Sequence, residues 1–399
     1  MNIDEYTLRR YLKEYYMKIF PCKYIQLWLS YGNAEKFHLR EFSFTSIFEE
    51  FSRYIVFNDE EEMRKTLARQ IPAKLDVGPA FNIMPIFKNK DKLIPLKKEI
   101  VIDIDINDYG DIRTCCSDAK LCRKCWKYMA IACKIIDTSL REDWGFQNIL
   151  WVFSGRRGIH AWICDPEIQE YSSSKRAGIA DFFQLVNKNA FGRYNVKIKR
   201  MNRFIERTII MINEIFVPMC VVEQDLLGNT NRIEKFVNLL PSSEVKQEVE
   251  KLFQAHTTSL DRWNAFVDYY QTQIESGNKV WLENSYFMEK IKIIYCYPRL
   301  DRNVTIAFNH LLKLPFSMHP KTGKISIPFD PKQVDIFNPQ KIPTVCSVVD
   351  QKNDFLDSNK NSKILNSNIN EYWDKTDLKD PINVFKKFLV GLYKTRHKS

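Results

Sequence analysis

The sequence predicts a mixed α/β protein that contains a cysteine module of the zinc-binding type and an inserted α-helical subdomain. Three observations predict this fold class. Apolar runs typical of strands occur at residues 100–106, 149–153 and 159–163. Segments with the apolar spacing of amphipathic helices surround these runs. Four cysteines lie within one short loop, Cys115–Cys125, where the spacing is typical of metal ligands.

The composition favours a globular chain with an anionic partner. The 399 residues are 45% hydrophobic and 13% aromatic, and the net charge is +11. The charged residues among the first 21 predict that there is no signal peptide, and no run approaches the roughly 20 apolar residues of a membrane span. Ten cysteines are few for a disulfide scaffold in a chain of this length. We therefore expect an intracellular, reducing compartment.

The order of the elements predicts five parts. Residues 1–171 form the N-terminal part of a core, which begins with a helix at Tyr6–Phe20 and includes the cysteine module at about 113–127. A helical subdomain follows at 172–285, and the core resumes at 286–345. Residues 346–380, rich in Asn, Ser, Asp and Lys, predict a flexible linker. Apolar residues at helical spacing predict a C-terminal helix at 381–399.

Several shorter segments carry local predictions. Residues 88–98 contain five lysines and Pro95, which predicts an exposed loop. The apolar run at 291–297 predicts a strand that Pro298 ends, and residues 304–312 have the spacing of a helix that begins beside Asp301. Asp301 is then either a functional carboxylate or only a helix N-cap. Turn residues at 319–324, followed by 325–329, predict a hairpin.

Two aspartates in an apolar strand indicate a metal site. Asp103 and Asp105 share one face of the run Ile100–Ile106, with Cα atoms roughly 6.6 Å apart. Buried carboxylates are costly without a compensating charge. Carboxylates at this spacing can converge on a pair of divalent cations, the arrangement used for phosphoryl and nucleotidyl transfer.

The cysteines Cys115, Cys116, Cys122 and Cys125 predict a structural zinc site. Four thiolates would fill the tetrahedron of the ion, which leaves no position open for catalysis. The alternative is a redox dithiol, although the βαβ setting of thioredoxin-like proteins is missing from the pattern.

A glycine-bearing turn between the two predicted strands at 149–163 carries Arg156 and Arg157, and His160 follows it. Guanidinium groups bind phosphate oxygens bidentately, and the glycines allow the backbone to approach closely. Lys313 and His319 can add positive charge to the same phosphates. Each of these residues alone would be unremarkable, so the prediction of a triphosphate site depends on the set.

These segments, in this order, resemble the small catalytic subunit of the eukaryotic and archaeal DNA primase, closest to the eukaryotic form. The resemblance spans most of the chain from Arg40 to Asp330, and the helical subdomain matches weakly. The segments that carry it are Arg40–Phe44, Asp76–Gly78, Val101–Asp105, Cys115–Cys116, Cys122–Trp126, Trp151–Gly158, Pro298–Asp301, His310–Lys313 and His319–Gly323.

The resemblance implies an α/β catalytic core with a zinc module and a helical subdomain beside it. It implies that Asp103, Asp105 and Asp301 hold two Mg²⁺ or Mn²⁺ ions. It also implies that the incoming nucleotide is bound by Ser154, Arg156, Arg157, His160, Lys313, His319 and Arg53, with Glu41 and Asp76 near the initiating nucleotide and the ribose. Phe51 stands where the family commonly has a tyrosine, which puts any hydroxyl contact there in doubt.

The implied activity is that of a DNA-directed RNA polymerase, which makes short RNA primers from ribonucleoside triphosphates on single-stranded DNA for replication. The implied partners are a large iron-sulfur primase subunit and the DNA polymerase alpha complex, in the nucleus and without a membrane. Two alternatives stay open: a non-catalytic, zinc-stabilised nucleic-acid-binding subunit, and a metal-dependent glycosyltransferase that uses the Asp-x-Asp element.

Overall fold

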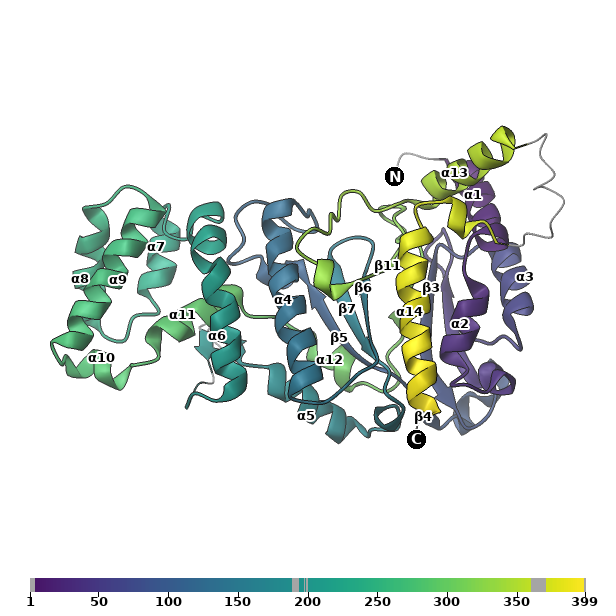
Figure 1. Ribbon diagram of the computed structural model, residues 1–399, viewed down its shortest axis with the longest axis horizontal. Coiled ribbons are helices and arrows are strands. Elements are labelled where there is room, and N and C mark those ends of the chain that lie inside the picture. The colour runs from purple at the N-terminus through teal and green to yellow at the C-terminus, as the bar shows by residue number, and fades with distance from the viewer. Residues whose placement is uncertain (1–3, 189–193, 197, 199, 360–370, 398–399) are drawn as a thin grey trace. The chain divides into compact units, whose positions relative to one another are not determined.

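The computed structural model describes residues 4–188, 194–196, 198, 200–359 and 371–397 (Figure 1). The chain forms two compact units. The first comprises Met1–Asp103, Gly145–Ala180 and Asp301–Ser399, and the second comprises Ile104–Trp144 and Asp181–Leu300. The predicted mixed α/β class is confirmed, because the described residues form three sheets and many helices.

The first unit contains a five-stranded sheet in the order β10-β3-β1-β2, and β4 also pairs with β3. All of its pairs are antiparallel. β1 and β3 are buried along almost their whole length, whereas β2 is an exposed edge strand. The strands of this sheet are β1 (Arg40–Thr45), β2 (Phe51–Ile55), β3 (Lys74–Phe81), β4 (Pro95–Lys97) and β10 (Leu312–Lys313).

A four-stranded sheet has the order β11-β6-β7-β5. Its central hairpin confirms the prediction for 149–163: β6 (Ile149–Phe153) pairs antiparallel with β7 (Gly158–Ile163), and every residue of both strands is buried. β11 (Ile327–Phe329) pairs with β6. β5 (Ile100–Asp105) is the predicted aspartate strand, and its two aspartates are less buried than its apolar residues.

Helices cover the first unit, and the predicted N-terminal helix is confirmed as α1. The C-terminal helix α14 packs on this chain: it contacts α2, β6 and β11, and Phe385 stacks edge-on against Trp28 in the core (Figure 1). The helices of this unit are α1 (Glu5–Lys18), α2 (Cys22–Leu29), α3 (Glu60–Gln70), α5 (Ser173–Phe183, whose end belongs to the second unit), α12 (Arg302–Ile306), α13 (Val345–Ser358) and α14 (Lys379–Arg396). Its 3₁₀ segments are η1 (Ala34–Leu39), η2 (Phe87–Lys92), η4 (Pro166–Ile168), η6 (Pro331–Gln333) and η8 (Trp373–Lys375).

The second unit is mostly helical. In Figure 1 the helices α7 to α10 gather into one group, and aromatic rings fill its core, with Phe266 against Trp263, Phe236 and Trp281. The helices are α4 (Arg123–Glu142), α6 (Arg203–Phe216), η5 (Val217–Glu223, a π-helix), α7 (Thr230–Val237), α8 (Ser243–Gln254), α9 (Ser259–Glu275), α10 (Lys279–Glu283) and α11 (Phe287–Cys296). The short elements are η3 (Ile106–Tyr109), β8 (Val186–Lys188) and β9 (Tyr194–Val196).

The division into units differs from the boundaries predicted at 171, 285 and 345. Residues 104–144 join the helical subdomain rather than the core, because α4 packs against α6 and α11. The hairpin of β8 and β9 also interrupts the expected all-helical stretch. Residues 189–193 lie outside the described part of the chain.

Three local predictions are wrong. Residues 291–297 belong to α11 rather than to a strand, because the apolar residues of this helix pack against α6. The helix predicted over 304–312 ends at Ile306, and Leu312 and Lys313 form β10. The residues predicted to form an exposed loop at 88–98 include most of η2 and all of β4, and Lys98 is buried.

The predicted linker at 346–380 begins with a helix, α13. A capping box between Thr344 and Ser347 begins α13, and Lys352 pairs with Glu14 of α1 at 2.6 Å. Residues 360–370 lie outside the described part of the chain. Among the residues that the structure describes, no helix has the length and apolarity needed to cross a membrane.

A buried ionic network supports the start of β5. Glu99 and Arg40 form an ion pair in which both side chains are fully buried. Burial raises the pKa of Glu99, but the charge and hydrogen bonds of Arg40 outweigh it and lower the pKa below its usual value. Arg176 of α5 donates to the carbonyl oxygens of Lys98 and Glu99, at 2.6 and 3.1 Å. Two buried arginines, Arg40 and Arg176, therefore hold the chain that leads into β5.

Candidate active site and cysteine cluster

The candidate carboxylate site lies where β5 meets the start of α12. The backbone N–H of Asp301 donates to the carbonyl oxygen of Asp103 at 3.0 Å, and Thr305 of α12 donates to Val101 O at 2.8 Å. Residues almost 200 positions apart in the sequence are thus brought together. The predicted N-cap is also present, since Asp301 Oδ1 accepts from the N–H of Asn303 at 2.9 Å. Asp105 is the last residue of β5 and, like Ile104 before it, belongs to the second unit.

Asp103 faces a histidine of the neighbouring strand. His160 Nε2 of β7 lies 3.4 Å from Asp103 Oδ1, and the His160 side chain is 7% exposed. The backbone register of β6 and β7 pairs His160 with Val152, two residues before the turn that carries the arginines. The strand pairing therefore positions the carboxylate and the predicted phosphate-binding turn on one sheet.

The two glycine-bearing turns pack against each other. Gly155 has a φ of +86°, and a Cβ there would lie 3.1 Å from Lys324 O and 3.3 Å from His319 Cβ. Thr322 Oγ1 also donates to Gly155 O at 3.0 Å. Only glycine tolerates both this φ and this approach. The structure thus joins the turn of Arg156 and Arg157 to the predicted hairpin that contains His319.

Lys313 is the buried cation of this site. Its Nζ donates to Ser154 O at 2.8 Å, and the residue is 8% exposed. Burial lowers the pKa of Lys313 to about 7, and the nearby charges of Lys74 and Arg156 contribute to the shift. The side chain therefore changes its charge near neutral pH.

His319 is held neutral. Burial lowers its pKa to about 3, and the charges of Lys313 and Arg156 act in the same direction. Its Nδ1 accepts the N–H of Lys321 at 3.2 Å. The neutral ring therefore carries its proton on Nε2, where it can donate one hydrogen bond to an anionic oxygen.

The remaining predicted site residues line the five-stranded sheet. Arg53 of β2 forms a bidentate ion pair with the buried Glu41 of β1, at 2.9 and 3.1 Å. Gly78 of β3 permits the approach, since a Cβ would lie 2.9 Å from Glu41 Oε2. Arg53 and Glu41, which were both predicted to bind nucleotides, thus form an ion pair with each other.

Asp76 of β3 is 2% exposed, and its Oδ2 pairs with Lys74 at 2.8 Å. Among the residues that the structure describes, its buried Oδ1 has no hydrogen-bond partner. A buried carboxylate oxygen normally accepts at least one donor. A hydroxyl group of a bound ligand would satisfy it. Lys74 is a functional candidate that the sequence pattern did not single out.

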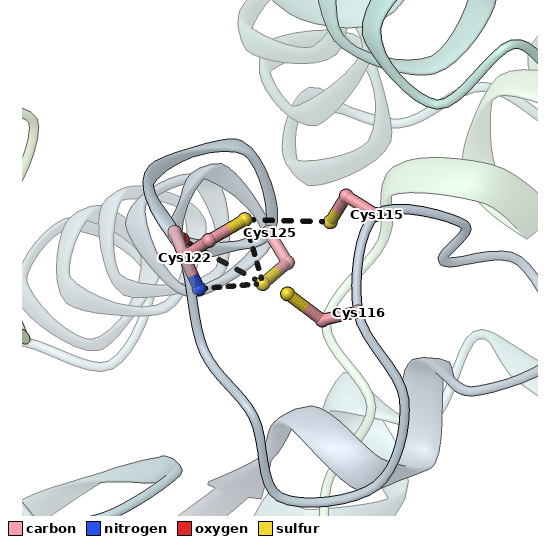
Figure 2. Close-up of side chains that lie close together, drawn as sticks. All are labelled: Cys115, Cys116, Cys122 and Cys125. Atoms are coloured by element: carbon pink, nitrogen blue, oxygen red, sulfur yellow. Dashed lines mark hydrogen bonds between the residues drawn. The ribbon is translucent and has the colours of Figure 1, made fainter.

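The four predicted cysteines form a possible metal site in the second unit. Figure 2 shows their sulfur atoms facing one another, with Cys115 and Cys116 on a loop and Cys122 and Cys125 at the start of α4. All four ligand atoms lie within 4.8 Å of one another. Cys122 Sγ is 3.6 Å from Cys115 Sγ and 3.7 Å from Cys125 Sγ. Four sulfur donors at this spacing fit a tetrahedral ion.

Two side chains outside the motif hold this loop. Gln224, which follows the last residue of the π-helix η5, accepts the N–H of Thr114 at 2.8 Å and donates to Cys115 Sγ at 3.4 Å. Arg113 donates to the carbonyl oxygens of Lys120 and Asp118, at 2.8 and 2.6 Å. Both residues are buried. The sequence pattern does not point to Gln224, because this residue lies 109 positions from Cys115.

The chain is similar to known proteins over most of its length. Residues 102–331 match the family model described as DNA primase small subunit. The DNA primase small subunit of Drosophila melanogaster is 34% identical over 411 residues, which cover 98% of this chain and 92% of the relative. The protein of the same name from Schizosaccharomyces pombe is 36% identical over 345 residues, 83% of this chain and 75% of the relative.

One solved structure aligns with most of the chain. It is the polymerase domain of Mycobacterium tuberculosis Ligase D in complex with DNA, which covers 90% of each chain at 10% identity with a TM-score of 0.38.

Proposed function

Because the chain belongs to the DNA primase small subunit family, we propose that it synthesises short RNA primers on single-stranded DNA by metal-dependent nucleotidyl transfer. It is a nucleotidyltransferase, as this family is. That assignment disagrees with both alternatives, a non-catalytic subunit and a glycosyltransferase. The observation that carries the proposal is the hydrogen bond between Asp301 and Asp103, which joins the two acidic segments beside the cationic turns.

We propose that Asp103, Asp105 and Asp301 hold two Mg²⁺ or Mn²⁺ ions. Carboxylate oxygens are the ligands these hard cations prefer, and the approach of Asp301 to Asp103 fits such a set. When bound, such ions lower the pKa of an attacking 3′-hydroxyl and offset the charge of the leaving pyrophosphate.

The cationic and neutral donors of the two turns would bind the triphosphate. Arg156 and Arg157 can bind its oxygens bidentately, and Lys313 adds a buried positive charge. The Nε2–H of His319 would donate without a change in charge at neutral pH. Ser154, His160 and Arg53 complete the proposed set. Chemistry of this kind depends on positioning and electrostatics and needs no covalent intermediate with a side chain.

The initiating nucleotide and the ribose are proposed to contact the sheet. The buried Asp76 Oδ1 supports this, because a ribose hydroxyl can supply the donor it lacks among the described residues. Glu41 already accepts two hydrogen bonds from Arg53, so its role in this proposal is to hold that arginine.

A template-dependent incorporation assay tests the proposed function. The purified chain is incubated with oligo(dT), labelled ATP and Mn²⁺, and the products are resolved by length. Short products that alkali hydrolyses are expected, because RNA contains the 2′-hydroxyl. Products that form without a template, or no products at all, would contradict primer synthesis.

The proposed triphosphate contact of Lys313 makes nucleotide binding pH-dependent. A phosphate stabilises the ammonium form, so binding raises the lysine's pKa from about 7 and takes up a proton. We therefore expect the affinity for ATP to fall by up to about tenfold per pH unit between about pH 7.5 and about pH 9. Calorimetry measures the profile.

Lys313→Arg is the matched control, because a guanidinium stays protonated throughout this range. Its binding profile should be nearly flat. A wild-type affinity that does not change with pH, or the same slope in both proteins, would rule out this contact.

We propose that the cysteine cluster binds structural Zn²⁺, since all four ligand positions would come from the protein. Gln224 would act on the metal through Cys115. Residues of this kind typically contribute about 10- to 100-fold in metal affinity. Gln224→Ala should therefore lose zinc at about tenfold lower chelator concentration, measured with a zinc-sensitive dye.

Gln271→Ala on α9 is the matched control, because this glutamine is exposed and its side chain donates to Glu275 in the same helix. Equal zinc retention in the two variants would show that Gln224 does not act on the site.

We further propose that the chain acts with a large iron-sulfur primase subunit and the DNA polymerase alpha complex in the nucleus. These proposals derive from the family resemblance. Copurification from cells tests the partners, and imaging of a tagged protein tests the location.

A further inference from the structure

Aromatic side chains remain exposed beside the proposed nucleotide site. Phe51 of the edge strand β2 is 56% exposed, and Phe87, the first residue of η2, is 70% exposed. Tyr54 of β2 meets Phe87 edge-on, with ring centroids 6.3 Å apart. Burying such a ring releases about 1.5–3 kcal/mol, so leaving the rings in water forgoes a sizeable stabilisation.

A β-bulge sets the direction of Tyr54. β1 advances two residues between Phe42 and Phe44 while β2 advances three between Ser52 and Ile55. Tyr54 has a φ of 62°, a left-handed conformation that costs a bulky residue about 1–2 kcal/mol. Arg53 Cζ lies 5.2 Å from the Tyr54 ring, so two consecutive side chains lie on one side of the strand. Bulges are common where a strand redirects a side chain next to an active site.

This bulge connects the rings to the proposed nucleotide site. Arg53 contacts the Tyr54 ring and also binds Glu41 with two hydrogen bonds. A base that stacks on Tyr54 or Phe87 would therefore lie close to residues proposed to bind the nucleotide.

Hydrogen bonds connect the two ends of the loop that carries Phe87. Asn82 and Ile94 exchange two hydrogen bonds: Asn82 N–H donates to Ile94 O at 3.0 Å, and Ile94 N–H donates to Asn82 Oδ1 at 2.8 Å. Inside the loop, Asn89 Nδ2 donates to Met84 O at 3.0 Å. The exposed ring is thus presented on a preorganised support, which lowers the entropic cost of binding.

The charge around the rings is positive. η2 carries the exposed residues Lys88, Lys90 and Lys92 against one acid, Asp91. Residues three apart eclipse in a 3₁₀-helix, and Lys90 Nζ lies 4.9 Å from the Phe87 centroid. A docked protein helix needs a continuous apolar surface, whereas these rings alternate with cations. Aromatic faces interleaved with lysines match the alternating bases and phosphates of a single strand.

We propose that Tyr54, Phe87 and the three lysines of η2 form a platform on which bases of the single-stranded DNA template stack. This template platform rests on the proposed primase function and assigns to it a substrate-binding surface. The bases contact the rings, and the lysines contact the phosphates on either side.

Fluorescence anisotropy with labelled oligo(dT) and the full chain tests the platform. Phe87→Ala should weaken binding about tenfold, because one stacking contact is lost, and Phe87→Trp should retain it. Tyr6→Ala on α1 is the control, since Tyr6 is also a surface aromatic, 77% exposed. The combined variant Lys88→Ala, Lys90→Ala and Lys92→Ala should reduce the slope of log affinity against log salt by about 2.

Duplex DNA separates stacking from charge, because its base faces are covered. Phe87→Ala should bind a duplex as wild type does. An equal loss on duplex and single strand, or a single-strand affinity equal to that of Tyr6→Ala, would overturn the platform.

The incorporation assay is run in parallel. Wild-type protein that makes RNA while Phe87→Ala binds oligo(dT) normally refutes the platform alone. If the wild-type protein makes no RNA, the proposed function is refuted. The single strand that binds the platform would then not be a template.

Discussion

Asp103→Asn is expected to give a folded protein that incorporates ribonucleotides at least about 100-fold more slowly than wild type. Asparagine keeps the size and the hydrogen-bonding shape of the side chain but removes its negative charge. Without that charge, the proposed divalent cations lose an anionic ligand, and stabilisation of the transition state at one such group contributes about 100- to 1000-fold in rate. Single-turnover incorporation on oligo(dT) measures the loss.

Asp374→Asn on η8 is the control, because this aspartate pairs with Lys375 at the surface and its side chain is 39% exposed. Both variants should unfold near the wild-type temperature. The Mn²⁺ affinity of Asp103→Asn, measured by electron paramagnetic resonance, should also fall. An Asp103→Asn protein with wild-type rate would refute the metal role of β5.

Glu99→Ala should lower the free energy of unfolding by about 3–5 kcal/mol, the usual cost of leaving one partner of a buried ion pair unpaired. The Arg40 guanidinium would stay fully buried without its carboxylate. Because folding lowers the pKa of Glu99, its contribution is present above the unfolded-state pKa near 4.5 and is lost as the pH falls through the folded-state value. Urea denaturation at neutral and acidic pH measures both effects.

Glu5→Ala removes a comparable contact at the surface. Glu5 and Arg9 pair at 3.0 Å with side chains 52% and 44% exposed, so the change should cost less than about 1 kcal/mol. If Glu99→Ala lowered the free energy of unfolding no more than Glu5→Ala does, the buried ion pair of Glu99 and Arg40 would not stabilise the start of β5. The loss of Glu99 is also expected to displace Asp103 in the strand that follows it. Glu99→Ala protein that is fully folded should therefore incorporate ribonucleotides more slowly than wild type.

The sequence predicted the elements whose signals are local. The hairpin at 149–163 has two apolar strands and a glycine turn within 15 residues, and the structure has both strands. The four cysteines were predicted to converge because they lie within eleven positions, and their sulfur atoms do. In each case a short chain segment leaves few ways to separate the groups.

The secondary structure of two segments was predicted wrongly, because local composition alone does not determine it. Residues 291–297 read equally well as a buried strand or a buried helix, and only the contact with α6 selects the helix. Residues 346–358 are polar enough to read as a linker. Burial of Val345, Val348 and Val349 and the ion pair of Lys352 with Glu14 order them as α13.

Local signals along the sequence define the chemistry available to the protein: the carboxylates of β5, the arginine turn, the thiols and the family that these motifs indicate. Tertiary structure decided which distant residues meet, such as Asp301 with Asp103 and Gln224 with Cys115. It also decided that Lys313 has a pKa of about 7 and that His319 is neutral. The reason is physical: spacing along the chain sets period and turn chemistry, whereas proximity and desolvation depend on how the whole core packs.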